Sequence, residues 1–157
     1  GAIWFRDRPA GELSLWDLLG PGSHGATYGG SPLACEISRV VIDTIVSDNL
    51  LSNAAILGKS ILDQAENRQM PMISEVRGLG LMVGFQLDVE MLEKATTIQG
   101  DGRAISVAVV DALSEAGLLT VPAGADVVRW LPPLVVCQED VDKAFGIMEK
   151  VLNHLMK

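Results

Sequence analysis

The fold is decided by the stretch MISEVRGLGLMVGFQL, residues 72–87. Apolar and β-branched residues on both sides of a glycine-containing centre are typical of two strands joined by a turn. We therefore predict strands over 72–76 and 81–87, with residues 77–80 as the turn. Within that turn, Arg77 is expected to bind backbone carbonyls, and a direct chemical role is the alternative.

Two helices are predicted before this hairpin. Ser31 followed by Pro32 marks a helix start, because serine caps a helix and proline fits the first helical position. The run Ser47-Asp48-Asn49 separates this helix from the next, which ends before Pro71. The apolar positions at helical spacing are Leu33, Ile37, Val40, Val41 and Ile45 in the first helix and Leu50, Ala54, Leu57, Ile61 and Ala65 in the second.

After the hairpin, helices and short strands alternate. Residues 104–116 are apolar on nearly every side, which is typical of a buried helix, and Gly117 is expected to cap its C-terminus. Short strands are predicted over 118–120 and 127–130, and an amphipathic helix over 139–155 closes the chain. This order indicates an α/β fold, in the form of a small α+β domain with helices packed on a mostly antiparallel sheet.

The composition limits the possible classes of protein. The 157 residues are 48% hydrophobic and 20% charged, which allows a packed core. A formal net charge of −8 disfavours nucleic acid as a partner, because phosphate backbones are bound by clustered Lys and Arg. No apolar run approaches the roughly 20 residues of a membrane helix. The first residues do not resemble a signal peptide and lack an initiating Met, so we expect a start within a longer chain.

The two cysteines, Cys35 and Cys137, lie far apart in the sequence. Neither has a His or Cys at metal-ligand spacing, so we expect no metal site. Free thiols in a reducing compartment are the simplest interpretation, which favours a cytoplasmic protein.

A glycine-rich loop, GSHGATYGGSP at residues 22–32, runs into the first predicted helix. Glycines let the backbone approach a ligand, and the hydroxyl of Thr27 can donate to a phosphate. The spacing matches neither the P-loop nor the Rossmann fingerprint. On the residues alone, a plain interdomain turn remains the alternative to a phosphate site.

A second candidate is Arg129, within VVRWLPPL at residues 127–134. An arginine inside an apolar strand is costly unless it is paired. Its guanidinium matches a carboxylate, so an arginine here would suit an anionic substrate. A structural ion pair with an Asp or Glu elsewhere in the fold is the alternative.

Three blocks of this sequence, in this order, resemble blocks of the class III aminotransferases, and most of all those of the acetylornithine and ornithine type. The family block H-G-[ST]-T-[FY]-G-G-N-P-L-A stands here at residues 24–34. The family block V-R-G-x-G-L-M stands at 76–82, and R-x-x-P-P-L stands at 129–134 before an amphipathic helix. The resemblance covers essentially the whole chain.

This resemblance implies fold type I and pyridoxal 5′-phosphate as cofactor. It makes residues 1–31 the end of the large cofactor-binding domain, with the phosphate loop at 22–31. Residues 32–157 would be the C-terminal small domain, including a linking helix over 32–47. Thr27 takes the position that reaches the cofactor phosphate of the neighbouring subunit, which implies a homodimer. Arg129 takes the position that binds the substrate α-carboxylate.

The sequence departs from the family pattern in small ways within the first block. Ala26 stands where Ser is common, which removes one possible hydroxyl contact to the phosphate. Ser31 stands where Asn is usual, and either residue caps a helix. His24 is expected to be structural.

The larger departure is that the lysine that binds the cofactor covalently lies upstream in this family. Gly1-Ala2 resembles the segment that follows it. None of the chain's own lysines, namely Lys59, Lys94, Lys143, Lys150 and Lys157, stands at the matching position. The cofactor's chemistry needs that lysine, so no catalytic residue is expected in this chain and the chain alone should not transaminate.

For the complete enzyme, the resemblance implies transfer of an amino group from N-acetylornithine, ornithine or a similar amine to 2-oxoglutarate, as in arginine biosynthesis and ornithine metabolism. The partners would be small amino acids and 2-oxo acids, with no nucleic acid and no membrane. The alternatives are a non-catalytic remnant acting as a dimerisation or binding module, and another class III activity such as 4-aminobutyrate aminotransferase, aminomutase or racemase.

Overall fold

The structure is a computed structural model that describes residues 9–10, 13–20, 22–23, 25–68, 70, 72–94 and 102–156. The chain divides into two compact units, Gly1–Asp48 and Asn49–Lys157, and each is described by itself. The predictions for Gly1-Ala2, His24, Pro71 and Lys157 lie outside the described residues.

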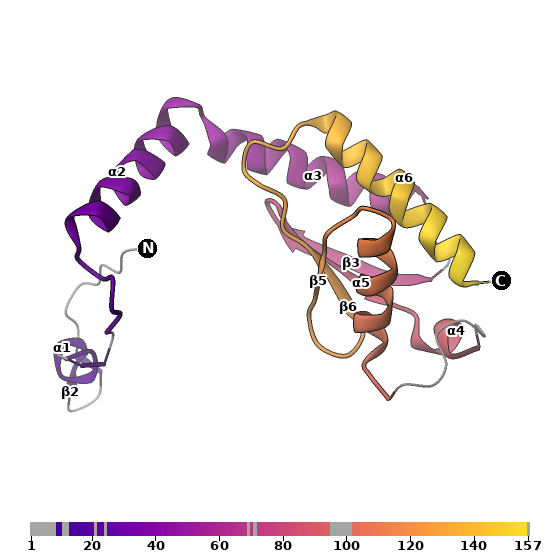
Figure 1. The fold of residues 1–157 in the computed structure, drawn as a ribbon, viewed down its shortest axis with the longest axis horizontal. Coiled ribbons are helices and arrows are strands. Elements are labelled where there is room, and N and C mark those ends of the chain that lie inside the picture. Colours follow the sequence, from indigo (N-terminus) through magenta and orange to yellow (C-terminus); the bar gives the residue numbers. More distant parts are fainter. Residues whose placement is uncertain are drawn as a thin grey trace. The chain divides into compact units, whose positions relative to one another are not determined.

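The N-terminal unit consists of short elements followed by one long helix (Figure 1). The two short strands pair antiparallel, and a turn region over residues 25–30 leads into the long helix. The elements are β1 (Pro9–Ala10), β2 (Leu13–Ser14), α1 (Leu15–Leu18) and α2 (Pro32–Ser47).

Helix α2 starts where the sequence predicts. The Ser31 hydroxyl accepts a hydrogen bond from the backbone N–H of Ala34 at 3.3 Å, and Pro32 occupies the first turn. Ser31 itself has extended backbone angles, as a capping residue requires. The helix ends at the predicted break, where Asn49 adopts a positive φ of 54°.

No residue of α2 is buried, and six of its large apolar side chains are exposed. They are Leu33, Ile37, Val40, Val41, Ile42 and Val46, each more than half exposed. Among the described residues, no single helix is long and apolar enough to cross a membrane. Only α2 and α3 taken together, as a broken pair, reach the necessary length and composition.

In the part that the structure describes, the C-terminal unit has a four-stranded sheet and four helices (Figure 1). The strand order is β3-β4-β6-β5 and every neighbouring pair is antiparallel, which confirms the predicted α/β class with a small antiparallel sheet. The elements are α3 (Leu50–Arg68), β3 (Ile73–Leu79), β4 (Met82–Leu87), α4 (Val89–Lys94), α5 (Ile105–Glu115), β5 (Val121–Pro122), β6 (Val127–Trp130) and α6 (Gln138–Leu155).

The hairpin is tighter than the sequence predicts. Leu79 pairs with Met82, so the turn consists of Gly80 and Leu81 alone. Gly80 supplies the positive φ of 55° that a two-residue turn needs. The predicted turn over 77–80 is therefore wrong for Arg77, Gly78 and Leu79, which belong to β3, and the strand predicted from residue 81 begins at Met82 instead. Because the turn uses only two residues, Gly78 lies opposite Val83 of β4 and pairs with it.

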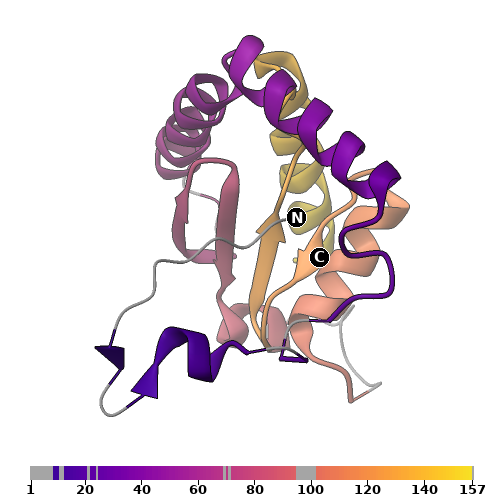
Figure 2. The same ribbon diagram turned by 90° about the vertical axis from the view of Figure 1, so that its left-hand side faces the viewer.

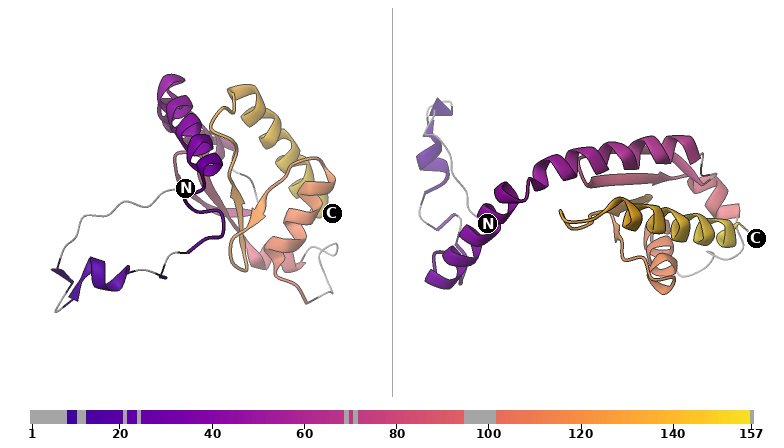
Figure 3. Two further views of the ribbon diagram at one scale, coloured as in Figure 1. Left: turned by 60° about the vertical axis from the view of Figure 1, so that its left-hand side comes forward. Right: turned by 90° about the horizontal axis from the view of Figure 1, so that it is seen from above.

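Helices α3, α5 and α6 contribute to one core on one face of the sheet. Figure 2 shows the strands side by side, and Figure 3 (right) shows α3 running along β3. At the centre, the Phe85 ring lies 4.7 Å from Trp130 and 6.2 Å from Phe145 between centroids. These ring contacts join β4, β6 and α6, and burial of the three rings stabilises the core.

Two further expectations are adjusted by the structure. The short strand predicted over 118–120 lies instead at β5, residues 121–122. The helix predicted over 104–116 forms as α5, but only Ser106, Val109 and Leu113 are buried. Gly117 follows it with a φ of 90°, as predicted for a C-terminal cap.

The domain boundary predicted after residue 31 refers to the whole enzyme and stays a prediction. Within this chain, α2 groups with the N-terminal unit and the division falls after Asp48.

Candidate functional site

Strand β6 places alternate side chains on opposite faces of the sheet. Val128 and Trp130 point into the helix-covered core, where both are buried. Arg129 lies between them and therefore points to the other face. Because successive side chains of a strand point to opposite faces of the sheet, an arginine can stand within this apolar strand without placing its charge in the core.

The register of the sheet sets the neighbours of Arg129. Arg129 is directly opposite Gly84 on β4, and Gly84 is directly opposite Arg77 on β3. On its other side, Arg129 is opposite Val121 of β5. Directly paired residues share a face of the sheet, so two arginines flank one glycine in a single row.

Arg129 is the arginine in this row whose side chain has no protein partner among the described residues. Its Nε atom is buried and makes no hydrogen bond. No described Asp or Glu forms an ion pair with it, so the structural ion pair weighed as an alternative is not found in the described part of the chain. A buried N–H donor without an acceptor costs free energy, which a bound anion would offset.

Arg77, in contrast, is engaged by its own neighbours. Its guanidinium lies 3.3 Å from the Glu75 carboxylate and donates to the Gln86 side-chain oxygen at 3.1 Å. The Gln86 amide in turn donates to Asp126. The expected contact of Arg77 with backbone carbonyls is therefore wrong, because Arg77 lies in a strand and reaches side chains across it.

The glycine-rich loop forms a series of turns before α2. The Gly29 N–H donates to the Ala26 carbonyl at 3.0 Å, and Gly30 has a φ of 76°. Thr27 lies inside this turn, exposed, and its hydroxyl makes no hydrogen bond to any described residue. The turn borders an open hollow of about 770 Å³ beside α2. Thr27 is thus available to an external acceptor.

Thr27 belongs to the N-terminal unit and Arg129 to the C-terminal unit. The expectation that the two residues serve one site stays a prediction.

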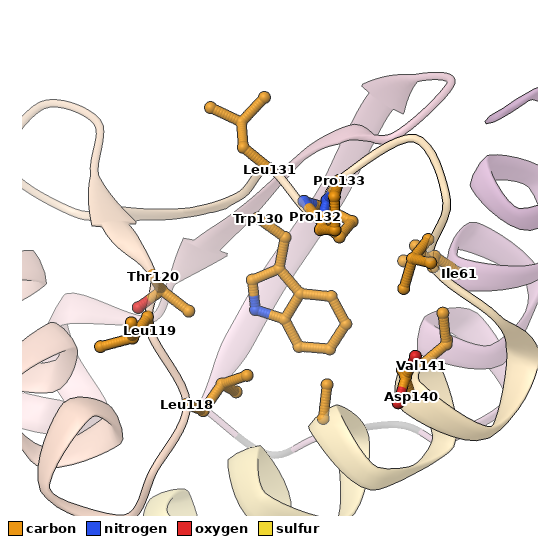
Figure 4. Close-up of a pocket in the computed structure, with 12 residues that line it drawn as sticks. Ile61, Leu118, Leu119, Thr120, Trp130, Leu131, Pro132, Pro133, Asp140 and Val141 are labelled. Carbon is orange, nitrogen blue, oxygen red and sulfur yellow. The ribbon is translucent and has the colours of Figure 1, made fainter. Parts of the chain in front are cut away.

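The segment after Arg129 borders a cavity of about 460 Å³ in the C-terminal unit (Figure 4). It is mainly apolar, and the indole of Trp130 forms part of its lining, between the other side chains that border it. The indole N–H of Trp130 and the hydroxyl of Thr120 are buried without a partner among the described residues. At its edge, the Cys137 thiol and backbone N–H donate to Asp140 and hold the pKa of that carboxyl below its usual value. Sequence reasoning did not identify this cavity, because no local pattern indicates it.

Both cysteines are exposed, free thiols, as expected. Among the described residues, no group of His, Cys, Asp or Glu is arranged to hold a metal ion.

A guanidinium without a partner among the described residues and a hydroxyl in a glycine-rich turn are both groups suited to bind anions. A comparison with protein families shows that the model described as Aminotransferase class-III matches residues 10–152. The chain belongs to the class III aminotransferases.

Similar proteins within this family carry two related names. The acetylornithine aminotransferase of Synechocystis is 35% identical over 143 residues, covering 89% of this chain and 31% of the relative. The ornithine aminotransferase of Exiguobacterium is 34% identical, covering 91% of this chain and 32% of the relative. The chain therefore spans about a third of the length of these relatives.

Solved structures give the same result. The ornithine aminotransferase of Toxoplasma gondii superposes with a TM-score of 0.68 at 30% identity, covering 88% of this chain and 31% of that one. The acetylornithine aminotransferase of Elizabethkingia anophelis superposes with a TM-score of 0.68 at 28% identity, and the match covers 88% of this chain and 34% of that one. The fold of the chain is thus that of the C-terminal part of PLP aminotransferases.

Proposed function

We propose that this chain forms the C-terminal part of a pyridoxal-phosphate-dependent aminotransferase that acts on N-acetylornithine or ornithine, with 2-oxoglutarate as amino acceptor. The names of the similar proteins support the substrate class. The observation that carries the proposal is the buried Nε–H of Arg129, which has no partner among the described residues and lies on the face of the sheet opposite the helix-covered core.

Arg129 would bind the α-carboxylate of the amino acid or 2-oxo acid. A guanidinium presents parallel N–H donors that match the two oxygens of a carboxylate. Because Arg129 is held on β6 between two paired strands, the bound carboxylate would take a fixed orientation. Since no Asp or Glu of the described chain pairs with it, the guanidinium would be available to the substrate.

Thr27 would donate its hydroxyl to the phosphate of pyridoxal phosphate. The residues fit this group: Thr27 is exposed and its hydroxyl makes no hydrogen bond to a described residue, and an added Cβ on Gly25 or Gly30 would meet nothing within 4 Å, so a phosphate has room to approach the backbone. The similar Toxoplasma enzyme holds PLP at its active site at partial occupancy. When bound, the cofactor supplies the electron sink for amino transfer.

The loop carrying Thr27 would act across the interface of a homodimer, at the cofactor of the neighbouring subunit. In this arrangement, the lysine that binds the cofactor covalently would lie in a part of the protein outside this chain. The surroundings of the described lysine side chains support this placement. Lys59, Lys143 and Lys150 are exposed, and the first two lie beside Asp63 and Asp140 on the helix surface. An exposed, ion-paired ammonium is not suited to act as the covalent lysine.

The test uses a full-length enzyme containing this chain, with Arg129→Ala and Arg129→Lys variants. We expect Arg129→Ala to raise KM for the amino acid and for 2-oxoglutarate by roughly 100-fold, the usual loss for a charge-assisted hydrogen bond. Arg129→Lys should recover part of the loss, because it keeps the charge without the planar fork. The matched control is Arg77→Ala, which removes the same charge from the same row and should change KM less than threefold. An unchanged KM in Arg129→Ala would refute the carboxylate role.

The amino donor is tested separately. Activity of the full-length enzyme would be compared on acetylornithine, succinylornithine, ornithine and 4-aminobutyrate. A preference for 4-aminobutyrate, or no transamination at all, would contradict the proposed function.

A further inference from the structure

The cavity beside Trp130 has a volume of about 460 Å³, which lies within the range of small-molecule sites in proteins. Residues from three parts of the C-terminal unit border it: helix α3, the segment before β5, and the segment that runs from the end of β6 into α6. Most of these side chains are apolar (Figure 4). A cavity of this size and composition suits an organic ligand with an apolar body.

Two polar groups in the lining of this cavity have no partner among the described residues. The side chain of Trp130 belongs to a residue that is only 5% exposed, and its indole N–H donates to no described acceptor. The hydroxyl of Thr120 is also buried without a described partner. In Figure 4 the indole nitrogen lies on the edge of the ring that is turned toward Thr120. Because a buried donor without an acceptor costs free energy, this edge of the cavity favours a ligand with an acceptor oxygen.

The charge around the cavity limits the ligand further. Asp140 is the charged residue among the described residues that border it, and its carboxylate accepts from the thiol and the backbone N–H of Cys137. A carboxylate at this position repels an anion. Arg129 does not border the cavity, because it points to the opposite face of the sheet from Trp130. A neutral ligand therefore fits better than an anionic amino acid or 2-oxo acid.

We propose that this cavity binds a neutral organic molecule with an apolar body and a carbonyl or similar acceptor oxygen, and that the oxygen lies at the Trp130 N–H and the Thr120 hydroxyl. The apolar body would contact side chains elsewhere in the lining, such as Ile61 and Val136. Removal of this apolar surface from water favours binding, and the hydrogen bonds select the acceptor. The inference does not depend on the reaction proposed above, because neither of the two candidate anion-binding residues takes part in it.

The experiment uses the full-length enzyme and two probes of similar shape, benzophenone and diphenylmethane. Benzophenone has a ketone oxygen between two phenyl rings, and diphenylmethane has a methylene group in its place. We expect Trp130→Phe, which keeps an aromatic ring but removes the N–H, to raise the Kd of benzophenone about tenfold by calorimetry. Thr120→Val, which replaces the hydroxyl with a methyl group, should raise it about threefold. The Kd of diphenylmethane should change less than about twofold in both variants, because this probe makes no hydrogen bond.

Matched controls and a labelling measurement locate the bound probe. Trp16→Phe and Thr44→Val make the same two changes in the N-terminal unit and should leave both Kd values unchanged. Ultraviolet irradiation attaches benzophenone to nearby C–H groups, so peptide mass spectrometry can identify the labelled segment. We expect the label within residues 118–120, 130–136 or 140–144, which border the cavity.

Three results would overturn the inference. The first is a full-length enzyme that does not bind benzophenone, as when another part of the protein fills the cavity. The second is a label outside the segments that border the cavity. The third is an equal loss of affinity for both probes in Trp130→Phe, which would indicate altered packing instead of a lost hydrogen bond. If Trp130→Phe does not fold, Thr120→Val is read in the same way.

Discussion

Gly58 of α3 packs on Gly80 of the β3–β4 turn so closely that a Cβ added to Gly58 would overlap the Gly80 carbonyl oxygen and lie 2.7 Å from its Cα. Helix and hairpin thus meet backbone to backbone. This contact fixes α3 against the hairpin, and through the hairpin it fixes the strand that carries Gly84.

We expect Gly58→Ala to destabilise the chain by about 1–3 kcal/mol, the usual cost of overpacking a close contact. The measurement is the free energy of unfolding from denaturant titration. The matched control is Gly146→Ala in α6, where an added Cβ would meet nothing within 4 Å. That change should stabilise by roughly 0.5–1 kcal/mol, because alanine favours a helix interior. Equal effects of the two substitutions would contradict the packing role of Gly58.

Asn53 ties α3 to the segment that follows Arg129. Its side-chain amide donates to the carbonyls of Leu134 at 2.8 Å and Val136 at 3.0 Å. Asn53→Ala should cost about 1–3 kcal/mol, because two partly buried carbonyls lose their donor. Asn67→Ala, on the exposed surface of the same helix, is the control and should stay within roughly 0.5 kcal/mol of the wild type. A loss no larger than that of the control would contradict the tethering role.

Asp140 is expected to make the folding stability of the chain decrease as the pH falls into the acid range. Hydrogen bonds from the Cys137 thiol and backbone N–H lower the pKa of Asp140 in the folded chain below its ordinary 3.8. A depressed folded pKa stabilises the fold above the unfolded value, and this contribution is lost as pH falls through the folded pKa. Asp140→Asn should therefore lower Tm at pH 6 and converge with the wild type in strong acid.

The control for this pH dependence is Glu139→Gln, which removes an equal charge from the same first turn of α6. Glu139 makes no capping hydrogen bond within the described residues, so its substitution should move Tm less at pH 6. A Tm difference between Asp140→Asn and the wild type that does not change with pH would contradict the assignment.

The exposed apolar side chains of α2 predict self-association of the isolated 157-residue chain. Light scattering should show species larger than a monomer. Val40→Glu/Val46→Glu, which places two charges among these side chains, should raise the monomer fraction. Thr44→Glu, which adds charge at a polar position of the same helix, should have a smaller effect. A monodisperse wild-type monomer would contradict this expectation.

The sequence predicted the elements well where local chemistry determines them. Ser31 and Pro32 define a helix start by themselves, and the apolar stripe of α6 defines a buried face. Arg77 was misplaced because the local pattern of glycines cannot show how many residues a turn uses. That number depends on the register between β3 and β4, which is a long-range property.

For the candidate site, the sequence by itself determined the residue types: a hydroxyl at Thr27 within a glycine-rich turn and a guanidinium at Arg129 within an apolar strand. Only the tertiary structure decided that the Nε of Arg129 finds no acceptor in the described chain, that Arg77 is already engaged, and that Gly84 lies directly between them. The physical reason is that strand pairing joins residues distant in the chain, so partners and free space across a sheet are set by register and not by neighbouring sequence.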